Sequence, residues 1–248
     1  MDLACLQFIE RRTSIPVPAV YAFDTSNNNA LGRPYTFMSV VSGTKLSKLW
    51  FDRAWFTEER RLRFWRSLAS CVSQLAQFEF HAIGTPICDA EAGTYSVVPF
   101  VSSRPEIDDS DTSAPAGPFT SVQEHLLAVI AKQIANETDA STTAMLRLLQ
   151  PYVYMLPEPD LSGPPFVMAH SDLNYQNIFV DDEGNVTAIL DWDDMAVGPR
   201  QSGCCRYPSW ITRDWDPTMY GYTYRDSDDE VCLAPSPFAS LLTVLPGR

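Results

Sequence analysis

The spacing of hydrophobic residues along the chain predicts four helices. Apolar side chains recur at steps of three or four through residues 57–80, and Thr57 stands where a helix N-cap is expected. Shorter stretches with the same period predict helices over residues 3–12, 121–135 and 142–156. By this pattern the segment 57–80 is a core helix and not a ligand-binding stripe.

Other stretches have the pattern of extended chain. Residues 15–23 begin with two X-Pro pairs, and a residue that precedes proline is pushed toward extended geometry. Residues 35–41 are rich in β-branched and aromatic side chains and end at a Ser-Gly break. Three more strands are predicted at residues 166–169, 178–180 and 186–190. The last two flank a polar turn, which predicts a β-hairpin.

Two segments lack any such periodicity. Residues 102–118 carry Pro, Ser and Asp in place of regular apolar positions, which is typical of an exposed loop that borders a site. Residues 231–248 contain three prolines, and we expect an irregular tail there.

Composition and charge narrow the range of partners. The 248 residues are 45% hydrophobic, which is enough for a sizeable core in one or two domains. Eighteen basic residues against 31 acidic ones give a formal charge of -13, which argues against nucleic acid and against an anionic membrane surface as partners. No apolar run approaches the roughly 18 to 20 residues of a membrane span, and no basic segment precedes the first apolar residues, so no signal peptide is expected. The acidic balance favours a cationic small-molecule substrate.

The six cysteines are scattered, and none has the paired short spacing of a tetrahedral zinc site. The adjacent pair Cys204 and Cys205 admits a redox role, but no basic cluster in the sequence would lower a thiol pKa there. Reduced structural thiols in the cytoplasm are the expectation.

Polar residues gather where the predicted strand 166–169 ends. His170, Asp172 and Asn177 follow it within one loop, and Asn177 leads into the predicted hairpin. The hairpin returns the chain so that Asp191, fourteen positions after Asn177, lies near that residue again. We therefore expect Asn177 and Asp191 to reach one metal ion.

Phosphoryl transfer needs this combination of groups. A carboxylate must orient the attacking hydroxyl and accept its proton, and hard oxygen ligands must hold Mg²⁺ on the nucleotide phosphates. Asp172 suits the first role, Asn177 and Asp191 suit the second, and His170 would brace the loop through hydrogen bonds. Each residue alone has an ordinary structural explanation, since a single histidine usually belongs to the core and an aspartate after a strand usually forms a turn. Their combination at fixed offsets is what indicates a phosphoryl-transfer site.

The pattern His170-Ser-Asp-Leu-x-x-x-x-Asn177, followed by Ile189-Leu190-Asp191-Trp192, resembles the signature of the aminoglycoside phosphotransferase and choline kinase group, fungal members above all. The likeness also covers residues 13–18, 35–43 and 214–217. The resemblance implies an α+β protein kinase-like fold, mainly the helical C-lobe with a remnant of the N-lobe. It divides the chain into an N-lobe remnant and hinge at residues 1–43, a catalytic lobe at residues 44–230 and the tail at residues 231–248.

The resemblance also implies roles for individual residues. Asp172 would be the catalytic base, supported by His170, and Asn177 and Asp191 would bind Mg²⁺. The segment from Met38 to Val41 would be the hinge whose backbone meets the adenine of ATP, so Met38, Ser39 and Val41 are the candidate nucleotide contacts. An ordinary sheet strand explains this segment equally well, and Ser39 stands where relatives often carry an acidic residue.

The chain departs from the family pattern at its beginning. It contains no glycine-rich phosphate loop and no strand lysine, and Asp2 falls at the position of the acid that pairs with this lysine. We therefore expect a chain truncated at its N-terminus, with apolar surface exposed around Phe37 and Met38. We also expect its affinity for ATP to be nearer millimolar than micromolar and its phosphotransfer to be slight.

The function expected from the sequence is ATP-dependent transfer of the γ-phosphate to a hydroxyl of a small molecule, with ATP and Mg²⁺ as cofactors. Two alternatives stay open. One is an inactive, truncated or pseudokinase-like binding module, and the other is a magnesium hydrolase that uses Asp191, Asp193 and Asp194. The sequence leaves the acceptor open among choline-like amines, sugars and amino-alcohols.

Overall fold

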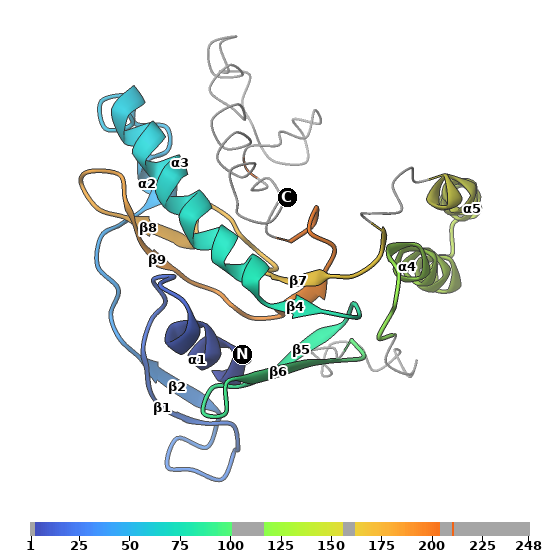
Figure 1. Ribbon diagram of the computed structural model, residues 1–248, viewed down its shortest axis with the longest axis horizontal. Helices are drawn as coiled ribbons and strands as arrows, with labels where there is room; N and C mark the ends of the chain where they lie inside the picture. The colour runs from blue at the N-terminus through green and yellow to red at the C-terminus, as the bar shows by residue number, and fades with distance from the viewer. Residues whose placement is uncertain (1–2, 101–116, 156–161, 204–209, 211–248) are drawn as a thin grey trace. The chain divides into compact units, whose positions relative to one another are not determined.

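The computed structural model of the chain describes residues 3–100, 117–155, 162–203 and 210. Across these ranges helices and short strands are interspersed, so the fold is mixed α and β (Figure 1). Most of the predicted loop at 102–118 and the whole predicted tail at 231–248 lie outside the described residues. None of the helices in the described ranges is both long enough and apolar enough to cross a bilayer.

The chain divides into two compact units, each assembled from segments that are distant in the sequence. The first unit comprises Met1–Phe8, Leu75–Ser171 and Trp192–Cys204, and the second comprises Ile9–Gln74, Asp172–Asp191 and Cys205–Arg248. The division into lobes at residue 43 rests on the family resemblance and stays a prediction.

The helix α1 (Leu3–Arg12) has the bounds that the sequence pattern predicts. Its buried side chains include Leu6, Phe8 and Ile9, each at most 1% exposed. Thr13 ends the helix, because its backbone N–H and its hydroxyl both donate to the carbonyl oxygen of Ile9, at 3.0 and 2.8 Å.

A three-stranded antiparallel sheet lies in the first unit. Its strands, in spatial order, are β10 (Ala196–Gly198), β7 (Phe166–Ala169) and β4 (Glu79–Phe80). The central strand β7 has the predicted bounds, and its residues Phe166, Val167 and Met168 are 0% exposed. A strand that is buried on both faces is a continuous apolar run, which explains why no alternation marks it in the sequence.

The first unit also contains a hairpin that the sequence pattern did not predict. Its strands are β5 (Thr85–Asp89) and β6 (Thr94–Val98). In β5 the side chains of Pro86 and Cys88 are buried while Ile87 is exposed, which is the period of a half-buried strand. Pro86 obscures this signal, because proline within a short apolar run argues against a strand.

Two helices complete the described part of the first unit, and they lie side by side (Figure 1). They are α4 (Val122–Asn136) and α5 (Ala140–Tyr154), close to the two helices predicted there. Each begins at a side-chain cap: Ser121 accepts from the N–H of Glu124 and Asp139 accepts from the N–H of Thr142.

The described part of the second unit holds two sheets and two complete helices. Strands β1 (Val20–Asp24) and β2 (Tyr35–Met38) pair antiparallel, and β2 ends three residues before the predicted strand does. The other sheet has the order β3 (Thr44–Lys45), β8 (Ile178–Val180) and β9 (Val186–Ile189), again antiparallel. The helices are α2 (Leu46–Leu49) and α3 (Glu58–Ser73). The hairpin of β8 and β9 confirms the one predicted from the sequence.

The predicted helix over residues 57–80 is correct at its start and wrong at its end. The hydroxyl of Thr57 accepts from the N–H of Arg60, as expected for the N-cap, and α3 then ends at Ser73. A 3-10 turn follows at Gln74–Gln77 and then β4, which pairs with β7. The apolar period continues through these residues, but strand pairing over a long sequence separation overrides helix propensity in their last part.

Candidate active site

His170 follows directly on β7 and belongs to the first unit. Its side chain is 7% exposed, and its ring meets the indole of Trp192 edge to face, with 4.6 Å between the ring centroids. Within the same unit the hydroxyl of Ser171 donates to the carbonyl oxygen of Asp193 at 2.6 Å. These contacts fix the end of β7 against the segment that follows Asp191.

The loop from Asp172 to Asn177 lies in the second unit and closes on itself through Asn177. The side-chain Nδ2 of Asn177 donates to the main-chain oxygen of Asp172 at 3.0 Å and to its carboxylate Oδ2 at 3.1 Å. The backbone N–H of Asn177 donates to the carbonyl oxygen of Asn174 at 2.8 Å. Asn177 is only 9% exposed and Asp172 is half-buried, so these bonds are partly shielded from water and restrict the orientation of the Asp172 carboxylate.

The hairpin of β8 and β9 brings the backbone of Asp191 next to Asn177, as predicted. Ile178 pairs with Ile189, and the N–H of Leu190 donates to the carbonyl oxygen of Asn177 at 2.8 Å. Asp191 follows directly, with an exposed side chain and a φ of 65°. A left-handed backbone is uncommon for a residue other than glycine and is found preferentially at functional sites.

The turn that joins β8 to β9 is built around one aspartate. The carboxylate of Asp181 accepts from the N–H of Glu183 at 3.0 Å, from the N–H of Asn185 at 2.8 Å and from Nδ2 of Asn185 at 2.8 Å. Burial alone would raise the pKa of Asp181, but these hydrogen bonds to the carboxylate together outweigh it and hold the pKa below its usual value. The ionised form of Asp181 therefore holds the turn together.

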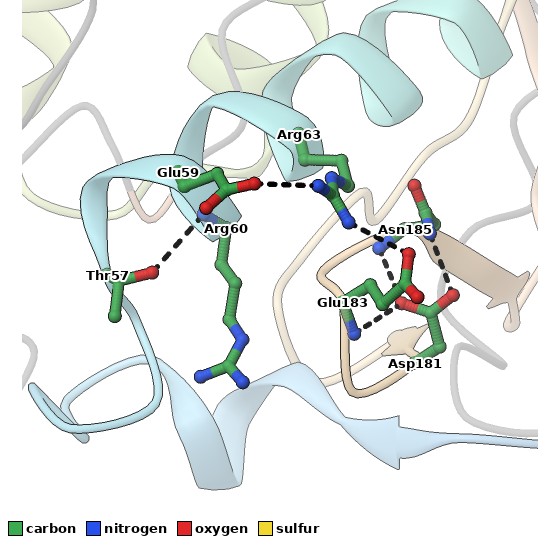
Figure 2. Close-up of polar contacts among 7 residues, drawn as sticks. All are labelled: Thr57, Glu59, Arg60, Arg63, Asp181, Glu183 and Asn185. Carbon is green, nitrogen blue, oxygen red and sulfur yellow. Dashed lines mark hydrogen bonds and ion pairs between the residues drawn. The ribbon is translucent and has the colours of Figure 1, made fainter.

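The same turn rests on the first part of α3, as Figure 2 shows. Arg63 donates to Glu183 of the turn at 2.8 Å and to Glu59 of its own helix at 2.9 Å. Gly184 has a φ of 94°, and a Cβ built there would stand 2.7 Å from the carbonyl oxygen of Arg60. Val186, the first residue of β9 after the turn, donates its N–H to the hydroxyl of Ser67 at 3.0 Å. The closed end of the hairpin that carries Asn177 and Asp191 is thus fixed to α3.

The groups proposed to hold Mg²⁺ have suitable chemistry. The amide nitrogen of Asn177 is committed to Asp172, which leaves its oxygen Oδ1 as the ligand atom, and Asp191 offers an exposed carboxylate. Magnesium is bound by few protein oxygens and completes its octahedron with phosphate and water. No group of three His, Cys, Asp or Glu side chains suited to a metal occurs in the part of the chain that the structure describes.

The predicted hinge also belongs to the second unit. Met38 is the last residue of β2, and Ser39 continues the ladder: its N–H donates to Ala19 at 2.8 Å and its hydroxyl accepts from the N–H of Ala19 at 3.0 Å. Val41 is half-buried, whereas Phe37 is 56% and Val40 98% exposed. The expected apolar exposure is therefore found at Phe37, while Met38 is half-buried.

The residues that directly follow the predicted hinge, Ser42 and Gly43, contact the sheet whose strands β8 and β9 lie next to the proposed metal ligands. The hydroxyl of Thr187 on β9 donates to the carbonyl oxygen of Ser42 at 2.8 Å. Gly43, with a φ of 93°, lies so close to β8 that a Cβ there would meet the carbonyl oxygen of Val180 at 2.5 Å. The predicted Ser-Gly break is thus a close contact between two backbones, where only glycine fits.

Asn174, in the same loop, was not among the site residues predicted from the sequence. Oδ1 of Asn174 is buried and has no hydrogen-bond partner among the described residues. A buried acceptor without a partner costs stability, which makes this atom a candidate for contact with a ligand or a bound water. The next residue, Tyr175, fixes the loop, because its carbonyl oxygen accepts from the N–H of Ser47 at 3.1 Å. The only signal in the sequence is the position of this amide between Asp172 and Asn177, two candidate site residues.

Comparison with known proteins gives a family match over most of the chain. Residues 2–220 match the model of the phosphotransferase enzyme family. The clavilactone A biosynthesis cluster protein Y of Ampulloclitocybe clavipes is 24% identical over 225 residues, which are 86% of this chain and 53% of that protein. The chain therefore spans about half the length of this curated relative.

Two solved structures can be aligned with nearly the whole chain. One is a protein of Ralstonia eutropha JMP134 named as an aminoglycoside phosphotransferase, which is 15% identical with a TM-score of 0.49, and the match covers 97% of this chain and 64% of that one. Another is the macrolide 2'-phosphotransferase MphH of Brachybacterium faecium, 17% identical with a TM-score of 0.45, where the match covers 98% of this chain and 63% of that one.

Proposed function

The chain belongs to the phosphotransferase enzyme family, and from this premise we propose that it serves ATP-dependent transfer of the γ-phosphate to a hydroxyl of a small molecule. The observation that carries the proposal is the double hydrogen bond from Asn177 to Asp172, together with the backbone bond from Leu190 to Asn177. The side chain of Asn177 orients the carboxylate of Asp172, and its backbone carbonyl oxygen is hydrogen-bonded to Leu190, the residue before Asp191.

In the proposed reaction the acceptor hydroxyl oxygen attacks the γ-phosphorus, and the bond from this phosphorus to the bridging oxygen breaks, so that ADP leaves. Asp172 orients the hydroxyl and accepts its proton as the new bond forms. Asn177 holds Oδ2 of Asp172, and the other carboxylate oxygen is the one assigned to the hydroxyl. The buried Oδ1 of Asn174, in the same loop, is proposed as an additional acceptor that helps to position the substrate.

Asn177 and Asp191 are the residues proposed to hold Mg²⁺. When bound, the ion supplies positive charge that neutralises the phosphate oxygens as ADP leaves. Asp191 provides the only full negative charge in this pair, and the left-handed backbone sets the direction in which its carboxylate leaves β9. Asn177 contributes an amide oxygen whose position is fixed by its bonds to Asp172.

The adenine contact is proposed for the backbone between Met38 and Val41. The N–H of Ser39 is already donated to Ala19, so the carbonyl oxygen of Ser39 and the backbone of Val41 are the groups assigned to the base. Support for this assignment comes from the chain path, because the segment after Val41 is bonded to β9 through Ser42 and Thr187.

A cationic acceptor is proposed because the chain carries a formal charge of -13, and an acidic surface concentrates cations near a site. Acceptors that differ in charge test this proposal. Choline and other amino-alcohols form one arm of the panel, and neutral sugars form the other. A higher kcat/KM for the cationic arm, which falls as salt is added, is the expected result.

The test of the proposed function is phosphotransfer by the purified chain at millimolar ATP and Mg²⁺, followed by ³¹P NMR. A phosphomonoester that forms only with acceptor, together with an equal amount of ADP, is the expected result, and Asp172→Asn serves as the control. Release of inorganic phosphate without acceptor would instead show a hydrolase. Nucleotide binding without turnover in any arm would show a binding module.

A further inference from the structure

Two cysteine sulfurs lie in contact in the first unit. The Sγ atoms of Cys5 on α1 and Cys88 on β5 are 3.0 Å apart, which is closer than the roughly 3.5 to 4.0 Å of ordinary non-bonded contact. Cys5 is 0% and Cys88 7% exposed. The thiol of Cys5 also lies 3.6 Å from the carbonyl oxygen of Pro86.

The packing around these sulfurs keeps them together. Phe8 follows Cys5 by one helical turn, and its ring meets Tyr95 edge to face with 5.8 Å between centroids. Tyr95 is in turn the cross-strand partner of Cys88 in the β5–β6 hairpin. Phe78 closes the cluster at 5.0 Å from Phe8 and 5.6 Å from Tyr95. Because aromatic contacts hold the helix and the hairpin at neighbouring positions, the two thiols meet without rearrangement of either element.

We propose that Cys5 and Cys88 form a reversible disulfide when the protein meets a peroxide. In the first step the thiolate of Cys88, the more exposed of the two, attacks a peroxide oxygen; for hydrogen peroxide this gives a sulfenic acid and hydroxide. In the second step the sulfur of Cys5 attacks the sulfenic sulfur, and the S–S bond forms as the S–OH bond breaks. Cys5 loses its proton, and the hydroxyl leaves as water. Each disulfide thus consumes one peroxide, and a dithiol reverses the reaction.

The bond would join residues 83 positions apart and so restrict the unfolded chain strongly. It would tie the start of α1 to the edge of the β5–β6 hairpin. For a loop of this length we expect the thermal midpoint to rise by about 10 °C in the oxidised protein. The folded structure would change little, since the sulfurs already touch.

A third buried cysteine provides a matched control. Cys71 lies on α3 and is 6% exposed, much like Cys88, but burial raises the pKa of its thiol to about 11. The thiolate is the reactive form, so Cys71 should stay reduced under the same oxidant. A disulfide between Cys5 and Cys88 beside a reduced Cys71 would show that peroxide acts selectively at the pair.

The experiment uses the full chain with Cys204→Ser, Cys205→Ser and Cys232→Ser, so that only the three buried thiols remain. After treatment with hydrogen peroxide and alkylation, cleavage at glutamate without reductant places each cysteine on its own peptide: residues 1–10, 60–79 and 80–91. We expect a linked species of peptides 1–10 and 80–91 that dithiothreitol resolves. Alkylation of both Cys5 and Cys88 as thiols after oxidation, or linkage through Cys71, would overturn the proposal.

Thermal unfolding gives the second readout. Peroxide should raise the midpoint in the parent and in Cys71→Ser by the same amount, and dithiothreitol should return it. In Cys88→Ser the peroxide-dependent rise should vanish, and a rise that persists in this variant would contradict the assignment. If Cys88→Ser does not fold, the peptide map of the parent decides, since it needs no substitution of either cysteine of the pair.

Discussion

The amide of Asn177 donates to both the main-chain oxygen and the carboxylate of Asp172, at 3.0 and 3.1 Å. The buried side-chain amide of Asn177, a proposed metal ligand, therefore also orients Asp172, the proposed base. A change at Asn177 must disturb Asp172, whereas a change at Asp191 leaves this bond in place. Substitutions at the three residues are thus expected to have distinguishable effects.

Asp172→Asn is expected to lower kcat by roughly a hundredfold or more and to leave nucleotide affinity nearly unchanged. The substituted amide still offers an oxygen to Asn177, so the loop keeps its hydrogen bond while the proton acceptor is lost. Steady-state kinetics combined with calorimetry of ATP binding separates the two quantities. Near-normal turnover in this variant would remove Asp172 from the role of base.

Asp191→Ala is expected to abolish the Mg²⁺-dependent part of nucleotide binding, because Asp191 carries the only charge among the proposed ligands. Asn177→Ala should weaken this part less. Titration of Mg²⁺ against a fluorescent ATP analogue measures the effect. Asp191→Asn is the matched control for backbone strain, since Asn also tolerates the φ of 65° found here. Unchanged metal dependence in both Asp191 variants would rule out this ligand.

Gly184→Ala is expected to lower the free energy of unfolding by about 2 to 4 kcal/mol, from left-handed strain and from a clash with α3. The added Cβ would stand 2.7 Å from the carbonyl oxygen of Arg60. Gly32→Ala is the control, because Gly32 also has a positive φ, of 65°, but nothing lies within 4 Å of its Cβ position. The control should lose only about 1 to 2 kcal/mol. Equal losses in urea unfolding would show that the turn does not press on α3.

Asp181→Asn is expected to reduce the dependence of stability on acid. The pKa of Asp181 is lowered in the folded state, so its contribution is complete above the ordinary value of 3.8 and is lost as the pH falls through the lowered pKa. At pH 7 the free energy of unfolding of the variant should be about 1 kcal/mol lower than that of the parent. The further decrease of this free energy in acid should be smaller for the variant than for the parent. Urea unfolding at neutral and acidic pH measures both, and Asp182→Asn, at the exposed neighbouring position, should behave like the parent.

Local patterns in the sequence predicted the elements that carry the site. Strand β7 and the hairpin of β8 and β9 were found because apolar runs and a polar turn mark them over a few consecutive residues. Strand β4 was not predicted, since Glu79–Phe80 is too short to show a period and forms only by pairing with β7. Tertiary pairing decided the structure of that segment, and no window of the sequence contains its partner.

The residue types of the site could likewise be predicted, but their bonding could not. Asp172, Asn177 and Asp191 follow from the motif and its spacing. How the loop closes in three dimensions determines three features that the sequence does not reveal. They are the two hydrogen bonds from Asn177 to Asp172, the buried oxygen of Asn174 and the left-handed φ of Asp191. Close packing on α3 likewise determines that Gly184 must be glycine, and α3 lies more than a hundred positions earlier in the chain.

The length of the hairpin between Asn177 and Asp191 determines how these two residues are placed relative to each other. Its closed end rests on α3 at Gly184, and its open end is fixed where Leu190 bonds to Asn177. Because side chains alternate between the two faces of a strand, inserting a single residue into β9 would turn each later side chain to the opposite face and carry Asp191 away from Asn177. Lengthening the turn instead would push it into α3. Related chains that keep the reaction should therefore keep this distance in sequence even where the loops around it vary in length.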